Sequence, residues 1–315
     1  MFKKILVTGS LAFDHIMDFT ETFEENIIPE KIKTLSVSFL AKNFSKNYGG
    51  VAGNIAYNLA LLGQKPSILS SCGKMDFETY AKHLENAGVE TNFINYVESE
   101  FSANMFMITD KNNCQIAGFY PGAMSMDEKL LIIKSDGFDF LIVSPTVPDA
   151  MNSFVCQTKK LRIPYLYDPA QQIPRLSADQ IKNGLKGAEI IIGNDYEIAL
   201  IEKKTGLNKK TILENAKIVI TTFGEKGSMI ETKKEKIIIG VSKPKKIVDP
   251  TGAGDAYIAG FMAGYIKEHP LHICGQMGAI AAVYAIEHYG TQKHKFKIED
   301  FENRYKETFK ESFNL

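Results

Sequence analysis

Short apolar runs alternate with helix-like stretches along most of this chain of 315 residues. A short apolar run is typical of a strand buried on both faces, and a helix between two such strands allows them to pair in parallel. The alternation therefore predicts an α/β fold with a mostly parallel central sheet covered by helices. The expected strands are 4–8, 66–70, 138–144, 165–167, 189–192 and 218–222, with a later hairpin at 227–231 and 236–240; the expected helices include 53–62, 80–86, 198–204 and 272–288.

Four extended segments do not follow this alternation: 16–19, 35–44, 103–109 and 115–119. We interpret them as a small sheet, contributed by residues 13–48 and 101–120, that packs over the mouth of the main domain. Such a lid would exclude water during a group-transfer reaction. The sequence shows no internal repeat and no low-complexity linker. Residues 1–315 are therefore expected to form one unit, in which the remainder of the chain builds a large α/β domain.

The composition fits an ordinary globular protein and argues against several classes of partner. Hydrophobic residues make up 44% of the chain and charged residues 23%, the formal net charge is zero, and the sequence pI is about 7.0. Such a chain is not expected to bind nucleic acid or a membrane surface, and we interpret the lysine-rich runs 233–236 and 243–246 as solvated loops.

Cysteine usage and the absence of targeting patterns suggest the compartment. The four cysteines lack Cys-x-x-Cys spacing, so they are expected to be scattered buried thiols in a reducing environment. The sequence has no signal-peptide pattern and no apolar segment of membrane-spanning length. The expected location is therefore cytoplasmic.

One glycine-rich turn carries most of the functional signal. Residues 248–256 read Val-Asp-Pro-Thr-Gly-Ala-Gly-Asp-Ala, between an expected β-run at 245–248 and an apolar helix at 256–266. Glycines allow a backbone to approach a ligand closely, and a helix N-terminus directs unpaired N–H groups at an anion such as phosphate. Asp255 is then placed to remove a proton from an attacking hydroxyl. Alternatively, the segment is only a tight turn in which Asp255 is a helix-start charge.

Four further segments accompany this turn. Asp14 follows the first strand and could accept hydrogen bonds from two sugar hydroxyls, or merely cap a turn. Residues 48–54 bring glycines and Asn54 to a helix start, and residues 221–227 would supply backbone for nucleotide contact. Residues 194–197 could hold phosphate or a magnesium hydration shell, or form a helix cap. Since ligands bind at the carboxyl ends of strands in open α/β sheets, these segments are expected on one rim of the sheet.

This combination resembles the ribokinase-like family of ATP-dependent sugar and nucleoside kinases over essentially the whole chain. The resemblance rests on Gly49 and Gly50 with Asn54, on residues 194–197 and on residues 249–255. It implies a three-layer α/β/α domain with a small β lid. It also implies that Asp255 is the general base, with the amides of Gly252, Ala253 and Gly254 as an anion hole. ATP and Mg²⁺ would be held by Asn194, Glu197 (the latter through water), Thr222, Gly224, Gly227 and Thr251, and Asp249 would lie at a site for a monovalent ion such as K⁺.

Within that family the chain is most similar to the actinobacterial-type adenosine kinases. The similarity rests on residues 8–10 with 14–15, 36–40, 119–125, 168–172 and 290–292. One position departs from the pattern: where relatives can place a second aromatic ring against the purine, this chain has Met105. Methionine packs on a flat ring through its polarizable sulfur but shapes a pocket less strictly, so a broader nucleoside range is credible. The similarity implies that Ser10, Asp14, Gly49, Gly50 and Asn54 hold the ribose, and that Ser38, Met105, Phe119, Gln171 and Gln172 surround the base.

The expected reaction is phosphorylation of the 5′-hydroxyl of adenosine by ATP with Mg²⁺, giving AMP and ADP. Another nucleoside or a free sugar such as ribose is the alternative acceptor, and a catalytically silent nucleoside-binding protein is a further alternative. The first strand–helix turn lacks Gly-x-Gly-x-x-Gly, which argues against a dinucleotide oxidoreductase, and no Gly-x-x-x-x-Gly-Lys-Ser/Thr loop is present. A homodimer is included among the expectations.

Overall fold

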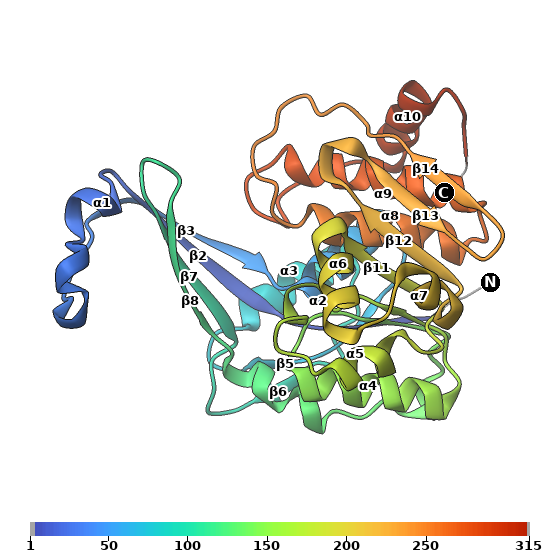
Figure 1. The fold of residues 1–315 in the computed structure, drawn as a ribbon, viewed down its shortest axis with the longest axis horizontal. Coiled ribbons are helices and arrows are strands. Elements are labelled where there is room, and N and C mark those ends of the chain that lie inside the picture. Colours follow the sequence, from blue (N-terminus) through green and yellow to red (C-terminus); the bar gives the residue numbers. More distant parts are fainter. Residues whose placement is uncertain (1–3, 314–315) are drawn as a thin grey trace.

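The computed structural model describes residues 4–313, and its centre is an eight-stranded sheet (Figure 1). The strands are β1 (Ile5–Thr8), β4 (Ser67–Leu69), β9 (Phe140–Val143), β10 (Tyr165–Tyr167), β11 (Ile190–Asn194), β12 (Ile218–Thr222), β13 (Ser228–Glu231) and β14 (Lys236–Ile239). Their order is β14-β13-β12-β11-β10-β9-β1-β4. The strands from β12 to β4 pair in parallel, and β13 and β14 add an antiparallel hairpin at one edge. The predicted mostly parallel sheet is thus confirmed.

Helices cover both faces of this sheet because its strands are apolar on both sides. In β1, Ile5 and Val7 belong to one hydrophobic core, while Leu6 between them belongs to the other. One face carries α2 (Val51–Leu61), α3 (Glu78–Ala87), α8 (Ala253–Ile266), α9 (Leu271–Ile286) and α10 (Ile298–Phe309). The other face carries α4 (Pro148–Leu161), α5 (Ala178–Leu185), α6 (Asp195–Thr205) and α7 (Lys209–Asn215).

A second, four-stranded sheet projects from this body as the lid (Figure 1). It is built from β2 (Ala12–Phe19), β3 (Ala41–Gly49), β7 (Ala103–Thr109) and β8 (Gln115–Tyr120), in the order β3-β2-β7-β8. Its tip carries the short helix α1 (Phe23–Asn26) and a 3₁₀ turn at Pro29–Thr34. A two-stranded ladder of β5 (Ser71–Gly73) and β6 (Asn95–Val97) lies on the body near the base of the lid.

Each part of the lid leaves the body and returns to it at neighbouring points. The backbone N–H of Ala52 donates to the carbonyl of Ser10 at 3.1 Å, which closes the base of the β2–β3 hairpin. The N–H of Ala123 donates to the carbonyl of Phe101 at 2.9 Å, which closes the base of the β7–β8 hairpin. These two bonds bracket residues 11–51 and 102–122, which contain the four lid strands, and fix where the lid joins the body.

Two predicted strands differ from the structure. Residues 245–248 form a loop in which Ile247 and Val248 are exposed. The loop is bonded to the C-terminal end of α9, where the Lys245 N–H donates to Glu287 Oε1 and the Val248 N–H donates to the carbonyl of Ile286. The apolar residues of this segment predicted a strand, but among the described residues no strand pairs with it, and the sheet ends at β14. The strand predicted at 35–44 begins only at Ala41, because the 3₁₀ turn at Pro29–Thr34 directs the chain away from the sheet.

Only two of the four cysteines are buried as expected. Cys72 and Cys274 are buried, whereas Cys114 and Cys156 are exposed, so the expectation of buried thiols was wrong for this second pair. Cys114 lies in the turn between β7 and β8, and Cys156 lies on the outer face of α4. Across residues 4–313, no helix has the length and apolar character that crossing a membrane requires.

Candidate active site

A cavity of about 550 Å³ lies where the lid meets the carboxyl ends of the central strands. Ser10 follows β1, Asp168 follows β10, and Asn194 ends β11, so the parallel strands bring distant parts of the sequence to one rim. Of the residues proposed from the sequence, those that line the cavity are Ser10, Asp14, Gly50, Asn54, Met105, Phe119, Gln171, Gln172, Asn194, Glu197, Thr222, Thr251, Gly252, Gly254 and Asp255.

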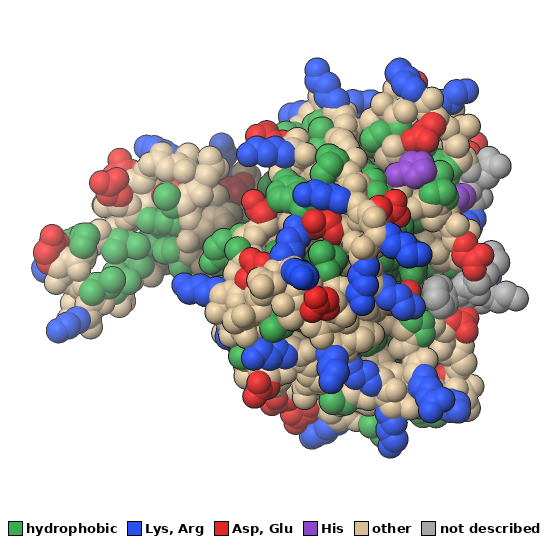
Figure 2. All heavy atoms as spheres, turned by 45° about the vertical axis from the view of Figure 1, so that its right-hand side comes forward, with side chains coloured by type: hydrophobic (Ala, Val, Ile, Leu, Met, Phe, Trp, Pro, Cys, Tyr) green, Lys and Arg blue, Asp and Glu red, His purple; other side chains and the backbone are tan. Residues whose placement is uncertain are grey.

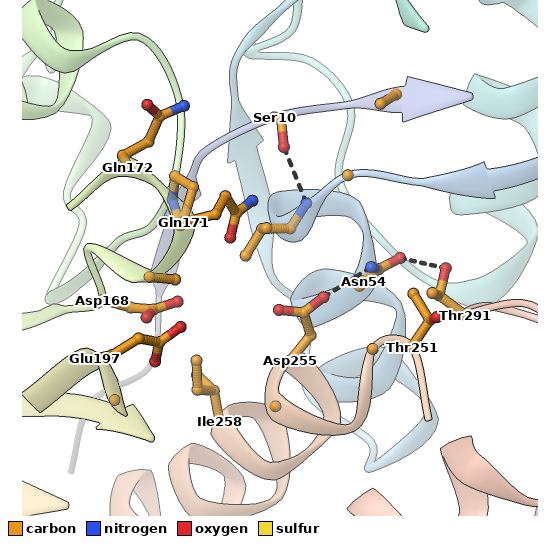
Figure 3. Close-up of a pocket in the computed structure, with 18 of the residues that line it drawn as sticks. Ser10, Asn54, Asp168, Gln171, Gln172, Glu197, Thr251, Asp255, Ile258 and Thr291 are labelled. Atoms are coloured by element: carbon orange, nitrogen blue, oxygen red, sulfur yellow. Dashed lines mark hydrogen bonds between the residues drawn. The ribbon is translucent and has the colours of Figure 1, made fainter. Parts of the chain in front are cut away.

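Asp255 projects into the cavity from the first turn of α8 (Figure 3). Burial raises the pKa of Asp255 to about 7, and the nearby charges of Asp14 and Glu197 contribute to this rise. One hydrogen bond opposes it: Asn54 Nδ2 donates to Asp255 Oδ2 at 2.7 Å. A carboxylate with a pKa near neutrality is suited to accept a proton from a hydroxyl and later release it.

The N-terminus of α8 faces the same cavity. Gly252, the residue before this helix, has φ of 79° in the left-handed region, and a Cβ there would meet the Thr291 side chain at 2.9 Å. Gly252 and Gly254 line the cavity, whereas Ala253 does not, and the Ala253 N–H donates to the carbonyl of Pro250 at 3.3 Å. The turn therefore presents two of the three proposed anion-hole residues to the cavity.

Asp14 enters the cavity from the lid, on β2. Burial, and secondarily the charge of Asp249, raise the pKa of Asp14 to about 6. Gly49 does not line the cavity but lies directly behind this carboxylate, so that any side chain at Gly49 would overlap it. Gly50 has φ of 83°, and a Cβ on it would come within 2.5 Å of the Ser10 carbonyl oxygen. The two glycines thus allow β3 to turn into α2 tightly against Asp14.

The outer end of the cavity is apolar. Met105 and Phe119 lie opposite one another on the paired strands β7 and β8, and Met124 adds a third apolar side chain from the body. Phe119 is 44% exposed, so part of its ring is available for contact with a flat ligand. Gln171 points into the cavity (Figure 3), and Gln172 is buried with Oε1 lacking any partner. This end of the cavity therefore offers apolar surface together with amide groups.

A third group of side chains faces Asp255 from α6 and β10 (Figure 3). Asn194 caps α6 by accepting from the Glu197 N–H at 2.8 Å, while Glu197 Oε2 accepts from the Asn194 N–H at 2.8 Å. The alternative interpretation as a helix cap is therefore correct, and it leaves both residues on the cavity wall. Burial raises the pKa of Glu197, and burial beside Glu197 and Asp255 raises the pKa of Asp168 well above its ordinary value.

The remaining proposed residues lie outside the cavity lining. Ser38 is exposed in the segment before β3, on the lid. Gly224 and Gly227 form the turn from β12 to β13, one step beyond Thr222. Both carboxylate oxygens of Asp249 accept backbone N–H groups, from Thr251 at 2.9 Å and from Gly290 at 3.0 Å. In this structure Asp249 therefore joins two loops, and its oxygens already have partners.

Several cavity residues were missed by the sequence analysis. Asp168 directly follows a predicted strand, so the rule that ligands bind at strand ends could have identified it. Thr291 was part of a noted string but was given no role, although it lines the cavity and its hydroxyl lies 2.7 Å from Asn54 Oδ1. Met124 belonged to the noted string 119–125 but was given no role, and Arg175 carries no local signal, since a single basic residue is ordinary in sequence.

The carboxylates of the cavity suit a hard divalent cation held together with a nucleotide. Within residues 4–313, no three His, Cys, Asp or Glu side chains group closely enough to form a metal site alone. Mg²⁺ commonly keeps several waters and takes only one or two protein carboxylates plus substrate phosphates. The buried carboxyl of Asp168 and the half-buried carboxyl of Glu197, on one wall opposite the α8 N-terminus, supply oxygen donors of the required chemistry.

Comparison with known proteins gives a consistent result. The sequence model of the pfkB family of carbohydrate kinases matches residues 4–297. A nucleoside kinase from Methanocaldococcus jannaschii is 31% identical over 293 residues, which cover 92% of each chain. The structure of Burkholderia thailandensis nucleoside kinase in complex with inosine has a TM-score of 0.88 at 28% identity and covers 98% of this chain and 99% of that chain. An adenosine kinase structure from Sinorhizobium meliloti, with a TM-score of 0.75 and 19% identity, covers 93% of this chain and 96% of that chain and shows a likeness of fold alone.

Proposed function

Because this chain belongs to the pfkB family of carbohydrate kinases, we propose that it transfers the γ-phosphoryl group of ATP to the 5′-hydroxyl of a nucleoside. The observation that carries the proposal is the two-ended cavity. Asp255 and the α8 N-terminus at one end suit phosphoryl transfer, while Met105 and Phe119 at the other end offer apolar surface that a free sugar would leave uncovered. The likeness to nucleoside kinases in both sequence and structure supports the same acceptor class.

In the proposed mechanism, Asp255 accepts the proton of the 5′-hydroxyl as that oxygen attacks the γ-phosphorus in line. The N–H groups of Gly252 and Gly254 stabilise negative charge that develops on the transferring group. Asp14, with Asn54 nearby, accepts hydrogen bonds from the ribose hydroxyls and so fixes the distance between acceptor and base. The lid, which carries Asp14, excludes water that would otherwise hydrolyse ATP.

The nucleotide side of the site uses the other wall. Asn194, Thr222 and Thr251 contact the phosphates, with Gly224 and Gly227 shaping the turn beyond them. Asp168 and Glu197 would hold Mg²⁺, Glu197 through water, and the ion would supply neutralisation of negative charge on the phosphates.

Adenosine is the acceptor that we propose to test first, with AMP and ADP as products. Its purine would lie between Phe119 and Met105, near Gln171 and Gln172. The inosine complex of the B. thailandensis enzyme makes inosine the strongest alternative. A glutamine amide can rotate to present either its oxygen or its N–H groups, so Gln172 is compatible with both purines.

A substrate panel tests the proposal. The kcat/KM values are measured with ATP and Mg²⁺ for adenosine, inosine, guanosine, cytidine and ribose, and the Asp255→Asn variant serves as the blank for contaminating kinases. At least one nucleoside is expected to exceed ribose by more than about tenfold, because a buried base adds more than about 1.4 kcal/mol of transition-state binding. Preference for ribose would replace the nucleoside assignment by a sugar kinase, and no turnover of any acceptor would favour a silent binding protein.

Three further expectations remain predictions. K⁺ dependence rests on Asp249, whose oxygens are engaged with backbone N–H groups here. A homodimer is favoured by the apolar side chains gathered on the projecting lid (Figure 2), among them the exposed Leu40, Phe44 and Phe106. The cytoplasmic location likewise awaits a direct test.

A further inference from the structure

A chain of buried hydrogen bonds behind the cavity joins a backbone carbonyl to Asp255. Tyr80 Oη donates to the carbonyl of Gly49 at 2.7 Å, and Gln292 Nε2 lies 2.5 Å from Tyr80 Oη. The same Gln292 Nε2 lies 2.9 Å from Asn54 Oδ1, and Asn54 Nδ2 lies 2.7 Å from Asp255 Oδ2. Tyr80, Asn54 and Gln292 are all buried, so water cannot replace their partners without reorganising the core.

The direction of every bond in this chain follows from its first member. A backbone carbonyl can only accept, so Tyr80 must donate its single hydroxyl proton to Gly49. The Tyr80 oxygen is then left as an acceptor, which requires Gln292 to turn its Nε2 toward it. The second proton on Nε2 points to Asn54, so the Asn54 side chain must present Oδ1 to Gln292 and Nδ2 to Asp255. If the Asn54 amide were reversed, its N–H groups would face the N–H groups of Gln292, and its oxygen would face the Asp255 carboxylate.

Thr291 cannot set this orientation alone. Its hydroxyl lies 2.7 Å from Asn54 Oδ1 and 2.9 Å from the carbonyl of Tyr48, but it has only one proton to donate. When that proton goes to Tyr48, the Thr291 oxygen could accept from a reversed Asn54 amide. An ionised Asp255 also favours the N–H side of Asn54, but a protonated Asp255 could donate to a reversed amide. Gln292 is therefore the side chain that keeps the two orientations of Asn54 unequal in both protonation states of Asp255.

We propose that Gln292 is a positioning residue for phosphoryl transfer, which acts through Asn54 by holding the N–H side of that amide toward Asp255. The inference rests on the proposed function, in which Asp255 is the base. Nothing in Gln292 touches the acceptor or the phosphates, since it lies behind Asn54 and does not line the cavity.

The charges around Asp255 explain why this orientation matters. Asp14 on β2, Asp168 after β10 and Glu197 on α6 face it across the cavity, and Arg175 is the one cation among the cavity-lining residues. Burial and the carboxylates of Asp14 and Glu197 raise the pKa of Asp255, and the Asn54 donor lowers it. Losing that donor would leave Asp255 protonated over a wider pH range and unable to act as a base.

The test compares Gln292→Met, which keeps the size of the side chain but removes its donors, with a matched control. The control is Gln276→Met, because Gln276 also pairs with a buried tyrosine, Tyr305, but between α9 and α10 and away from the cavity. The pH dependence of kcat/KM reports the base in the free enzyme. The acid limb is the fall of kcat/KM toward low pH, where the base becomes protonated. We expect it to move up by about one to two pH units in Gln292→Met, given about 1.5–3 kcal/mol for a hydrogen bond to a charged group and about 1.4 kcal/mol per pH unit.

Recovery at high pH separates this role from a merely structural one. Gln292→Met should lose kcat/KM near pH 7 and regain most of the wild-type kcat/KM at least two pH units higher, whereas a misshapen site stays impaired at both pH values. Gln276→Met should leave the acid limb in place even if it lowers Tm. An unmoved limb in Gln292→Met, or an equal displacement in the control, overturns the proposal.

A second variant keeps the question answerable if Gln292→Met does not fold. Tyr80→Phe removes the hydroxyl that orients Gln292 and should move the limb in the same direction by a smaller amount, with Tyr305→Phe as its control. In the double variant the two displacements should not add, since both act through Asn54. If Asp255→Asn is inactive but the acid limb does not move in Tyr80→Phe, the role of the hydrogen-bond chain is overturned and the base assignment stands. If Asp255→Asn is active, the base assignment itself is overturned.

Discussion

The central sheet and the lid contribute to one cavity but are built in opposite ways. Strands β1, β9 and β10 are buried along their whole length, with apolar side chains on both faces. In the lid, every residue of β8 is exposed, and β3 is exposed over most of its outer half. Figure 2 shows the same contrast on the surface, where hydrophobic side chains gather along the projecting lid while charged ones are spread over the body.

This difference in burial between the body and the lid corresponds to two proposed tasks, the chemical step and recognition of the acceptor. Asp255, which we propose as the base, and the turn at Gly252, which we propose as the anion-binding site, stand at the start of α8, which packs against α9 and α2 in the body core. Asp14, Met105 and Phe119, which we assign to the acceptor, stand on lid strands with solvent on one side. A rigid body suits the chemical step, for which small displacements are costly, and a thin sheet suits recognition, which requires opening and closing. Variants in the body should therefore change mainly kcat, and variants in the lid should change mainly the KM for the acceptor.

The largest effect is expected on the body side. Asp255→Asn should lower kcat by on the order of 10²–10⁴-fold, because it removes the group that accepts the hydroxyl proton. The KM for the nucleoside should change little, since the amide keeps the shape of the side chain. Steady-state kinetics with the best acceptor measure both constants, and kcat near the wild-type value would remove Asp255 from its role.

On the lid side, Asp14→Ala should act mainly on acceptor binding. A hydrogen bond to a charged group contributes about 1.5–3 kcal/mol, so KM for the nucleoside should rise by about 10- to 100-fold. The KM for ATP should stay close to the wild-type value. Kinetics with 2′-deoxyadenosine provide a check: if the variant still discriminates against the deoxy compound as strongly as wild type, Asp14 does not bind the ribose.

A smaller contrast is expected within the lid itself. Phe119→Ala should raise the adenosine KM by about tenfold, because an aromatic contact adds about 0.5–1.5 kcal/mol beyond the area that it buries. Met105→Phe should change the adenosine KM only modestly, since methionine–aromatic contact reaches a similar energy. Both KM values are compared with that for ATP. Unchanged adenosine kinetics in Phe119→Ala, with better use of ribose, would place the sugar-kinase alternative first.

A last effect concerns stability rather than kinetics, and on the body side it is expected for Asp255. The folded-state pKa of Asp255 is raised from 3.8 to about 7, so ionising this group costs stability as the pH rises through that window. Each unit of difference between the folded-state and unfolded-state pKa corresponds to about 1.4 kcal/mol of folding free energy, so a rise of about three units predicts up to about 4 kcal/mol that Asp255→Asn should recover. The variant should therefore have a higher Tm than wild type above the folded-state pKa and the same Tm below the unfolded-state pKa. Equal Tm values on the alkaline side would show that the carboxylate ionises without cost.

The sequence predicted those parts of the fold that depend on repeated local patterns. The buried strands and their helices produce the alternation directly, and the lid segments stood out because they break it. The strand at 245–248 was predicted wrongly because Ile247 and Val248 are apolar yet exposed, and composition does not reveal whether a run has a strand to pair with. Both roles of Asn194 could be predicted. Its N-cap role follows from the glutamate three residues later, and its place at the cavity follows from its position at the end of a strand.

The contacts within the site could not be predicted in the same way. Asn54 and Asp255 are 201 residues apart, and no local pattern indicates that an amide will orient a carboxylate at that separation. Gln292 looks like an ordinary polar loop residue until the fold places it between Tyr80 and Asn54. The position of Ser38 also depends on long-range geometry, namely how the tip of the lid lies relative to its base.

The two backbone bonds that close the base of the lid make it an exchangeable module. Since Ala52 bonds to Ser10 and Ala123 to Phe101, residues 11–51 and 102–122 begin and end at fixed points of the body whatever their length. A change of length within such a closed loop costs little, because closure entropy grows only slowly with loop length. Acceptor choice can therefore diverge through insertions and substitutions in the lid while the sheet and the base remain unaltered, and chimeras joined at these four residues should fold around the same body.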